Sequence, residues 1–286
     1  MMDFVHALLD PRIAFLRYAV LVGLLASVAF GITGTYVVTR RISYLAAAIA
    51  HCVLAGVGAA VYLQYRYGFR WADPLLGAAI AAILSALVIG WVSLSARQRE
   101  DTAIGAVWSV GMAVGLLFLQ KTPGYLADPM SYLFGDILLV GPTDLWNVAA
   151  LDLVVVGLVG IFHPKLMAVC FDEEFAAVRG LPVKAYYLLL LCLTALSIVL
   201  LIRVVGMILV IALMTLPAAA AGQFTRRLGP MMFWAVGLCM ACVLAGIALS
   251  YSWELRTGPV IVLAAGALYA AAAGIKRLLH GPPRST

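Results

Sequence analysis

The stretch that decides the fold spans residues 39–62 and reads Thr39-Arg-Arg-Ile-Ser-Tyr-Leu-Ala-Ala-Ala-Ile-Ala-His51-Cys-Val-Leu-Ala-Gly-Val-Gly-Ala-Ala-Val-Tyr62. An arginine pair precedes a run that holds no Asp, Glu, Lys or Arg and is long enough to cross a bilayer as a helix. His51 lies near the middle of this run. An ionisable side chain at that depth needs a polar partner, a water-filled path or a ligand. His51 is therefore a candidate functional residue, and the alternative is an ordinary buried hydrogen bond.

The composition assigns the whole chain to a membrane. Of its 286 residues, 65% are hydrophobic and 11% are charged, and the mean hydropathy is +1.06. Soluble proteins are about half apolar and a quarter charged. The net charge of +6 is typical of basic cytoplasmic loops and does not indicate nucleic-acid binding. No cleavable signal peptide is evident at the N-terminus, so we expect the first span to direct insertion.

Charge-free runs of about 20 residues recur along the chain, and each can cross a bilayer as a helix. They predict an all-α polytopic membrane protein with eight or nine transmembrane helices, in a single domain over residues 1–286. Arg203 alone separates the sixth run from the seventh, and the segment before the fifth run has the alternative of a short re-entrant or interfacial piece. The nine candidate spans are Tyr18–Val38, Ile42–Tyr65, Pro74–Ala96, Thr102–Gln120, Leu145–Phe162, Ala185–Ile202, Val204–Gly222, Pro230–Tyr251 and Gly258–Ile275.

Positive charge falls in alternate loops, which assigns these loops to the cytoplasm. This pattern puts the C-terminus inside and, with nine spans, the N-terminus outside. Arg12 and Arg17 argue against an outside N-terminus. The basic residues predicted to be cytoplasmic are Arg40, Arg41, Arg97, Arg99, Lys165, Arg179, Lys184, Arg226, Arg227, Lys276 and Arg277.

Small residues within the spans predict close helix packing, because helices in lipid associate through backbone approach rather than through the hydrophobic effect. The glycine pairs expected to make such contacts are Gly56 with Gly58, Gly111 with Gly115, and Gly157 with Gly160.

Three features of the later spans are assigned structural roles. Gly206 lies near the start of the seventh span, and Pro217 lies inside it. A proline there removes one backbone donor, which predicts either a helix break near a pathway or a packing kink. Cys239 and Cys242 have CxxC spacing on an apolar helix, which favours packing over redox chemistry.

The segment between the fifth and sixth spans predicts a short cytoplasmic helix at about residues 170–180. Acidic residues at its start favour the N-terminus of a helix through the helix dipole, and Gly180 and Pro182 end it. Apolar side chains fall on one face, so we expect this helix to dock on a partner. The alternative is a helix on the membrane surface, where acidic residues are repelled by anionic lipid. The acidic residues are Asp172, Glu173 and Glu174, and the apolar face holds Phe171, Phe175 and Val178.

The chain resembles, over nearly its whole length, the integral-membrane permease subunits of ABC importers for zinc, manganese and iron. Each matching stretch alone is weak, but all six occur in the family's order. The resemblance implies a type II ABC importer-like permease fold in the bacterial cytoplasmic membrane. The stretches are Thr39–Tyr44 followed by Ala50–Gly56, Arg99–Gly105, Tyr132–Leu138, Phe171–Ala176, Val204–Ala221 and Thr257–Leu263.

The same resemblance implies a set of partners and a cargo. We expect a homodimer of permeases surrounded by membrane lipid, two cytoplasmic ATPase subunits that receive residues 171–175 as a coupling helix, and an external metal-binding protein. No Gly-x-x-x-x-Gly-Lys-Ser/Thr loop occurs in the chain, so ATP hydrolysis is expected in the partner and not in this subunit. No permanently bound cofactor is expected. A divalent metal is the transported substrate, with zinc first and manganese or iron next.

The chain departs from the family at the candidate metal site. Family members commonly carry Gly-Asp-x-x-x-His in the second span, whereas this sequence has Ala46 and Ala47 before His51. Two His51 imidazoles facing each other across a dimer axis suit zinc better than harder ions. Cys52 is an alternative ligand, although it lies about 100° around the helix from its neighbour.

Two aspartates are weaker candidates for the metal path. Asp152 lies in the fifth span, where the alternative is a helix–helix hydrogen bond, and Asp136 lies in the Phe-Gly-Asp segment before that span. Two other functions stay open. The missing carboxylate favours a metal chelate, such as a siderophore or corrinoid, as the cargo. A secondary carrier or intramembrane enzyme is less favoured, because the chain has no complementary set of buried charges and no HExxH or GxSxG motif.

Overall fold

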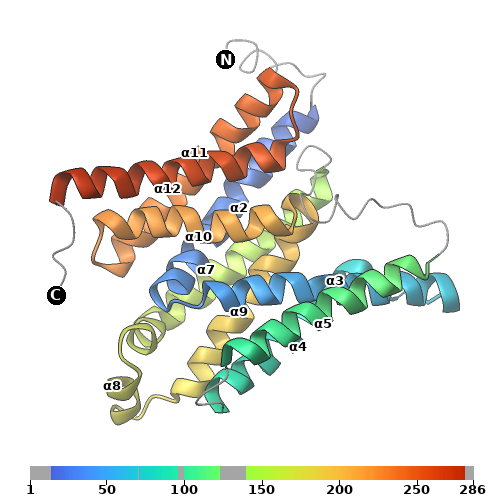
Figure 1. Ribbon diagram of the computed structural model, residues 1–286, viewed down its shortest axis with the longest axis horizontal. Coiled ribbons are helices and arrows are strands. Elements are labelled where there is room, and N and C mark those ends of the chain that lie inside the picture. The colour runs from blue at the N-terminus through green and yellow to red at the C-terminus, as the bar shows by residue number, and fades with distance from the viewer. Residues whose placement is uncertain (1–13, 70, 96–99, 123–139, 281–286) are drawn as a thin grey trace.

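The computed structural model describes residues 14–69, 71–95, 100–122 and 140–280. These residues form nine long helices and one short helix, without a strand, which confirms the all-α prediction (Figure 1). The nine long helices lie at the positions of the nine candidate spans. In chain order the helices are α2 (Ala14–Thr39), α3 (Ser43–Tyr67), α4 (Pro74–Ser95), α5 (Glu100–Gln120), α7 (Pro142–Phe171), α8 (Glu173–Val178), α9 (Val183–Val205), α10 (Met207–Phe224), α11 (Leu228–Trp253) and α12 (Thr257–His280).

Most of the long helices meet the requirements of a membrane span. Within the described ranges, α2, α3, α4, α7, α10, α11 and α12 are long and apolar enough to cross a bilayer. Helices α5 and α9 contain shorter apolar segments, Ile104–Gln120 and Val183–Val199. The chain is thus a multi-pass membrane protein.

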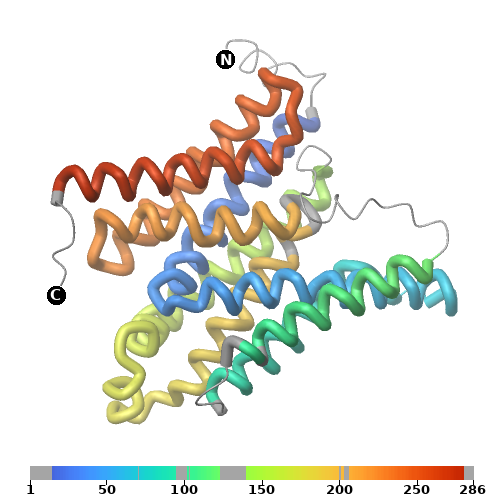
Figure 2. The backbone as a smooth tube through the Cα atoms, viewed as in Figure 1, coloured from blue at the N-terminus to red at the C-terminus, as the bar shows by residue number. Residues whose placement is uncertain are grey.

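Helix α2 runs through the middle of the array and contacts helices from both halves of the chain. It packs on α7, α10 and α11, while α3, α4 and α5 form a group that α9 joins through α4 (Figures 1 and 2). The core holds large side chains from α2 and α9, including Phe30, Tyr36 and Leu191. This arrangement places the helix that carries His51 between α4 and α5.

Glycines bring α3 close to both neighbours. A Cβ atom on Gly115 of α5 would lie 2.5 Å from the carbonyl carbon of Leu54, and one on Gly111 would lie 2.7 Å from the Cys52 sulfur. On the opposite side, a Cβ atom on Gly77 of α4 would clash with the carbonyl oxygen of Gly56. Larger side chains would push these helices apart, which confirms the predicted close packing on α3 and α5.

The third glycine pair does not behave as predicted. Among the described residues, no atom lies within 4 Å of a Cβ atom built on Gly157 or Gly160 of α7. Both glycines are exposed, so the prediction of close packing is wrong for this pair within the described residues of one protomer.

Helix α7 is longer than the sequence predicted. The expected span ended at Phe162, but the helix continues through Pro164 to Phe171. Its 30 residues extend over about 45 Å, more than the roughly 30 Å of bilayer hydrocarbon. The extension is held against α2 by a 2.8 Å hydrogen bond between the Tyr36 hydroxyl and His163 Nδ1. Helix α7 continues past Pro164, although a proline removes one backbone hydrogen bond, and leads to the short helix α8.

Helix α10 continues through Pro217 without a break, which excludes the predicted alternative of a helix break at this residue. The proline has no N–H to offer to the carbonyl of Leu213, four residues earlier. The Cys239 thiol of α11 lies 3.9 Å from that carbonyl oxygen as a weak donor. The separation of α9 from α10 occurs at Gly206, whose φ of +86° suits glycine. It does not occur at Arg203, where the sequence put the boundary.

The basic helix ends gather at one end of the array, the end that carries α8 (Figure 1). One cavity is lined by Arg40 and Arg41 together with Glu173 of α8. A second cavity beside Phe171 is lined by three further basic residues, Arg226, Arg227 and Lys276. Residues assigned to separate cytoplasmic loops are therefore neighbours in space.

Candidate functional site

A tight turn sets the start of α3 and therefore the position of His51. The N–H of Ile42 donates to the carbonyl of Val37 (3.0 Å), and the N–H of Arg41 donates to that of Val38 (3.1 Å). This is the Schellman pattern that commonly ends a helix. Arg41 takes the left-handed position with a φ of +61°, where glycine is usual and another residue costs about 1 kcal/mol or more. His51 follows eight residues after Ser43, about 12 Å along α3.

The ring of His51 is held in one orientation by the backbone of its own helix. Its Nδ1 lies 2.8 Å from the carbonyl oxygen of Ala47. A carbonyl oxygen only accepts, so Nδ1 carries the proton in the neutral ring and Nε2 keeps its lone pair. No described residue forms a hydrogen bond with Nε2. This is the arrangement of a metal-ligating histidine, whose second nitrogen is fixed by a carbonyl or carboxylate.

An aromatic row connects His51 with a cavity at the α8 end. The imidazole lies against Trp108 of α5 with ring centroids 4.4 Å apart. Trp108 in turn contacts Tyr44, with centroids 5.6 Å apart. Tyr44 lines the cavity of about 390 Å³ beside Glu173. His51 is thus connected to this cavity through two aromatic side chains, Trp108 and Tyr44.

One protomer offers a single well-placed ligand. Within the described ranges, no group of three or more His, Cys, Asp or Glu side chains is arranged to hold a metal ion. Cys52 is buried, and its thiol donates to the carbonyl of Val107 on α5 (3.2 Å). The sulfur therefore points to a different neighbour from the His51 ring. A metal at Nε2 would need its remaining ligands from water, from an external metal-binding protein or from a second copy of the chain.

Asp152 lies apart from His51, in α7 against α2. It is only 7% exposed, and neither carboxyl oxygen has a hydrogen-bond partner among the described residues. The helix–helix hydrogen bond weighed from the sequence is therefore not formed in this structure. Asp136 lies outside the described residues.

Helix α8 has the boundaries and the apolar surface expected of a docking helix. Asp172 caps its N-terminus by accepting a hydrogen bond from the N–H of Phe175 (2.9 Å). Gly180, with a φ of +76°, follows its end. Phe175 and Val178 are 52% and 87% exposed. Phe171 is also exposed but belongs to the last turn of α7.

Arg40 connects α8 with the start of the His51 helix. Its guanidinium forms an ion pair with Glu173 of α8 and donates to the Val169 carbonyl of α7 (3.2 Å). It also lies 5.4 Å from the ring centroid of Tyr187 on α9. The Tyr187 hydroxyl is 3.0 Å from the Ser93 hydroxyl of α4. Helices α2, α4, α7, α8 and α9 are therefore joined at this point.

Sequence reasoning did not find Arg40 or Trp108 as site residues. It used Arg40 only to assign a loop to the cytoplasm. An arginine directly before a span and a glutamate in a distant loop can form an ion pair, but the sequence analysis did not consider this one. It also treated Glu173 as part of the docking surface, whereas this carboxylate faces Arg40. No sequence signal marked Trp108, because its contact with His51 depends on how α3 packs on α5.

Known proteins are similar to this chain in sequence. The sequence profile described as the ABC 3 transport family matches residues 12–275. A probable metal transport system membrane protein of Chlamydia pneumoniae is 39% identical over 252 residues, which cover 88% of this chain and 86% of the relative. The manganese transport system membrane protein MntC of Halalkalibacterium halodurans is 33% identical over 259 residues, which cover 91% and 86%.

A solved structure extends the similarity to three dimensions. A chain of PsaBC from Streptococcus pneumoniae, in complex with Fab, is 29% identical and superposes with a TM-score of 0.82. The match covers 95% of this chain and 94% of that chain. The likeness therefore involves the whole helical array and not one motif alone.

Proposed function

Because this chain belongs to the ABC 3 transport family and is a metal transport permease of the cytoplasmic membrane, we propose that it moves divalent metal ions inward by ATP-driven alternating access. The observation that carries the proposal is the fixed orientation of His51, whose Nε2 lone pair has no partner in the described part of the chain. A ligand prepared in this way in a metal permease is suited to hold the ion during transit.

Zinc is the proposed cargo. A neutral imidazole is a common zinc ligand, whereas manganese prefers oxygen. The position one turn before His51 holds Ala47 and provides only a carbonyl oxygen, which already accepts from Nδ1. In the proposed homodimer, the second copy's imidazole completes a two-nitrogen transit site, and few ligands keep the binding weak enough for release.

Manganese is the second candidate. The relative from Halalkalibacterium halodurans is named as a manganese transport protein, and water molecules can complete an oxygen-rich shell around one histidine. The two ions can be distinguished by measuring uptake of each with the same preparation.

ATP hydrolysis is assigned to a partner. We propose that two ATPase subunits dock on α8 of the two permeases and that an external metal-binding protein delivers the cargo. The exposed side chains of Phe175 and Val178 offer an apolar surface for such docking. Helix α8 then transmits closure of the ATPase to the membrane helices.

The docking surface has a direct test. Phe175→Ser with Val178→Ser should lower co-purification of the ATPase subunit with the permease, because both side chains are exposed and form the apolar surface of α8. Ala177→Ser, at an exposed position of the same helix, is the matched control and should retain the ATPase. Equal recovery of the ATPase with all three proteins would exclude α8 as the docking helix.

The function itself is tested by uptake into vesicles that hold the complete complex with its own binding protein. We expect zinc to enter with ATP and not with ADP, and zinc to enter faster than manganese. Uptake of a metal only as a siderophore or corrinoid chelate would replace the proposal with the chelate alternative. Uptake without any ATPase subunit would indicate a secondary carrier.

A further inference from the structure

A second, unassigned cavity lies at the α8 end of the array, between the ends of α2, α10, α11 and α12. Its volume is about 350 Å³, which is room for roughly ten water-sized groups. It lies beside Phe171 and is separate from the cavity that Tyr44 lines. The lining residues used here are Arg226, Arg227, Lys276, Gln223 and Met231.

The cavity is positively charged and contains no counter-charge. Arg226 and Arg227 come from the α10–α11 connection, and Lys276 comes from the last turns of α12. No Asp or Glu lines the cavity, and none of the three cations forms an ion pair within the described residues. Like charges held together repel each other, and a bound anion would relieve this repulsion.

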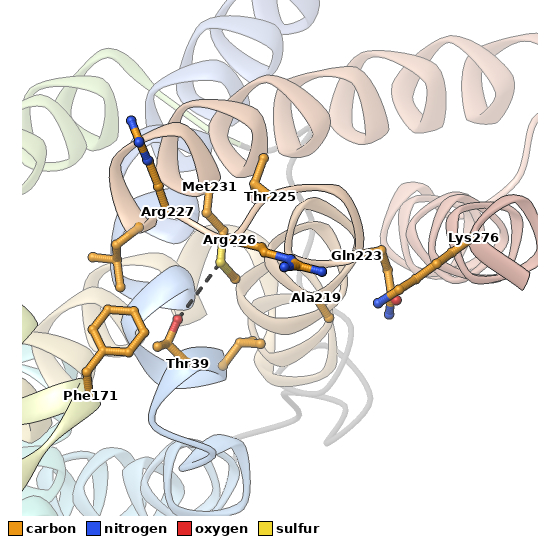
Figure 3. Close-up of a pocket in the computed structure, with 12 residues that line it drawn as sticks. Thr39, Phe171, Ala219, Gln223, Thr225, Arg226, Arg227, Met231 and Lys276 are labelled. Atoms are coloured by element: carbon orange, nitrogen blue, oxygen red, sulfur yellow. Dashed lines mark hydrogen bonds between the residues drawn. The ribbon is translucent and has the colours of Figure 1, made fainter. Parts of the chain in front are cut away.

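The side chains define where an anion would lie. In Figure 3 the side chains of Arg226 and Lys276 extend toward Gln223 from opposite sides, whereas Arg227 points away. Two cations and an amide, from α10, the α10–α11 connection and α12, thus face one point. The floor on the other side is apolar, with Val38, Leu228 and Met231.

The helix surfaces beside the cavity are expected to face membrane lipid. Directly beside Gln223 and Lys276 in sequence, Phe224 and Ile275 are 54% and 49% exposed, and both belong to helices apolar enough to cross a bilayer. Basic pockets between transmembrane helices on the cytoplasmic side suit anionic headgroups. A protein carboxylate would satisfy the charge equally well but would not need a rim of exposed apolar side chains.

We propose that this cavity binds the phosphodiester headgroup of an anionic phospholipid, with Arg226 and Lys276 on the phosphate oxygens and Gln223 on the adjoining glycerol hydroxyls. The acyl chains lie along the exposed apolar side chains of α10 and α12. This site does not depend on the proposed cargo or on ATP, because binding is measured without transport.

The test uses the full-length permease in nanodiscs of phosphatidylcholine with a minor fraction of phosphatidylglycerol. Native mass spectrometry then gives the ratio of the two lipids that stay bound. We expect enrichment of bound phosphatidylglycerol on the wild type. In Arg226→Gln/Lys276→Gln, we expect this enrichment to fall roughly fivefold for each cation neutralised. Lys184→Gln/Arg277→Gln removes two exposed charges outside the cavity and should keep the enrichment. Unchanged thermal melting in pure phosphatidylcholine verifies folding.

Several results would overturn the site. An equal loss in both double variants would indicate diffuse surface attraction, and full enrichment in Arg226→Gln/Lys276→Gln would leave the cavity without a role in lipid binding. Binding of soluble glycerol 3-phosphate in pure phosphatidylcholine, at the level seen for the lipid, would assign the cavity to a free phosphate compound. In a separate co-purification of the permease with its ATPase subunit, loss of that subunit from Arg226→Gln/Lys276→Gln, with lipid binding unchanged, would assign the cavity to a protein partner.

Discussion

At the scale of single residues, the proposed metal ligation by His51 depends on which ring nitrogen carries the proton. The carbonyl of Ala47 fixes Nδ1 as the donor and so leaves Nε2 for the cargo. The sequence identified His51 because an ionisable group in a charge-free span is unusual. It could not identify the tautomer, Trp108 or the direction of the Cys52 thiol, since each depends on the packing of α3 against α5.

The absent carboxylate makes a prediction about selectivity. Ala47→Asp would place a carboxylate one helical turn before His51, on the same face. We expect the ratio of manganese to zinc uptake to rise by about an order of magnitude, or about 1.4 kcal/mol, because manganese prefers oxygen ligands. Ala47→Asn, of the same size but neutral, is the control. A ratio that rises equally with Asn, or that does not change with Asp, would contradict the assignment of this helix face to the metal path.

At the scale of elements, the packing of α3 rests on glycines that approach backbone atoms directly. The small-residue spacing in the sequence predicted these contacts for α3 and α5, since close approach in lipid favours Gly at the interface. The same spacing was misleading in α7, where the glycines have no neighbour within the described chain. Spacing shows that a helix can be approached closely, but not that another helix lies there.

This difference gives a matched pair of variants. Gly115→Ala places a Cβ atom 2.5 Å from backbone atoms of Leu54 and should lower the free energy of unfolding by about 1–3 kcal/mol. Gly157→Ala meets no atom within 4 Å and should be neutral or slightly stabilising, because alanine favours the helix. Thermal unfolding in detergent compares the two. Equal melting temperatures would show that α3 and α5 are not in close contact.

The junction at Arg40 connects α8 with α2 and hence with the His51 helix. Arg40→Gln removes the ion pair with Glu173 and the charge-assisted hydrogen bond to Val169, which together contribute about 1–3 kcal/mol. We expect metal uptake to fall while ATP hydrolysis by the assembled complex persists. Without the Arg40 contacts, closure of the ATPase subunits is no longer transmitted from α8 to α2. Arg41→Gln, at the exposed neighbouring position, is the control. Parallel loss of uptake and hydrolysis would indicate a folding role instead of a coupling role.

At the scale of the whole molecule, helix number and order could be predicted from the charge-free runs, because a bilayer requires each span to satisfy its own backbone. The grouping of basic loops predicted which helix ends share one end of the array. The sequence could not show how far a helix extends past the bilayer. Helix α7 continues past Pro164, and its extension contacts α2 through Tyr36 and His163, residues 127 positions apart in the chain.

The role of His51 in transport is tested by ATP-dependent zinc uptake into vesicles that hold the complete complex, with wild type, His51→Ala and Cys52→Ala compared. We predict that His51→Ala lowers uptake by at least roughly 10- to 100-fold, since altering an outer-shell partner of a metal ligand alone has this effect. The variant complex should still assemble. Cys52→Ala should transport zinc as the wild type does, because its thiol is directed to Val107. Normal zinc uptake by His51→Ala would contradict the account and leave His51 as a packing residue.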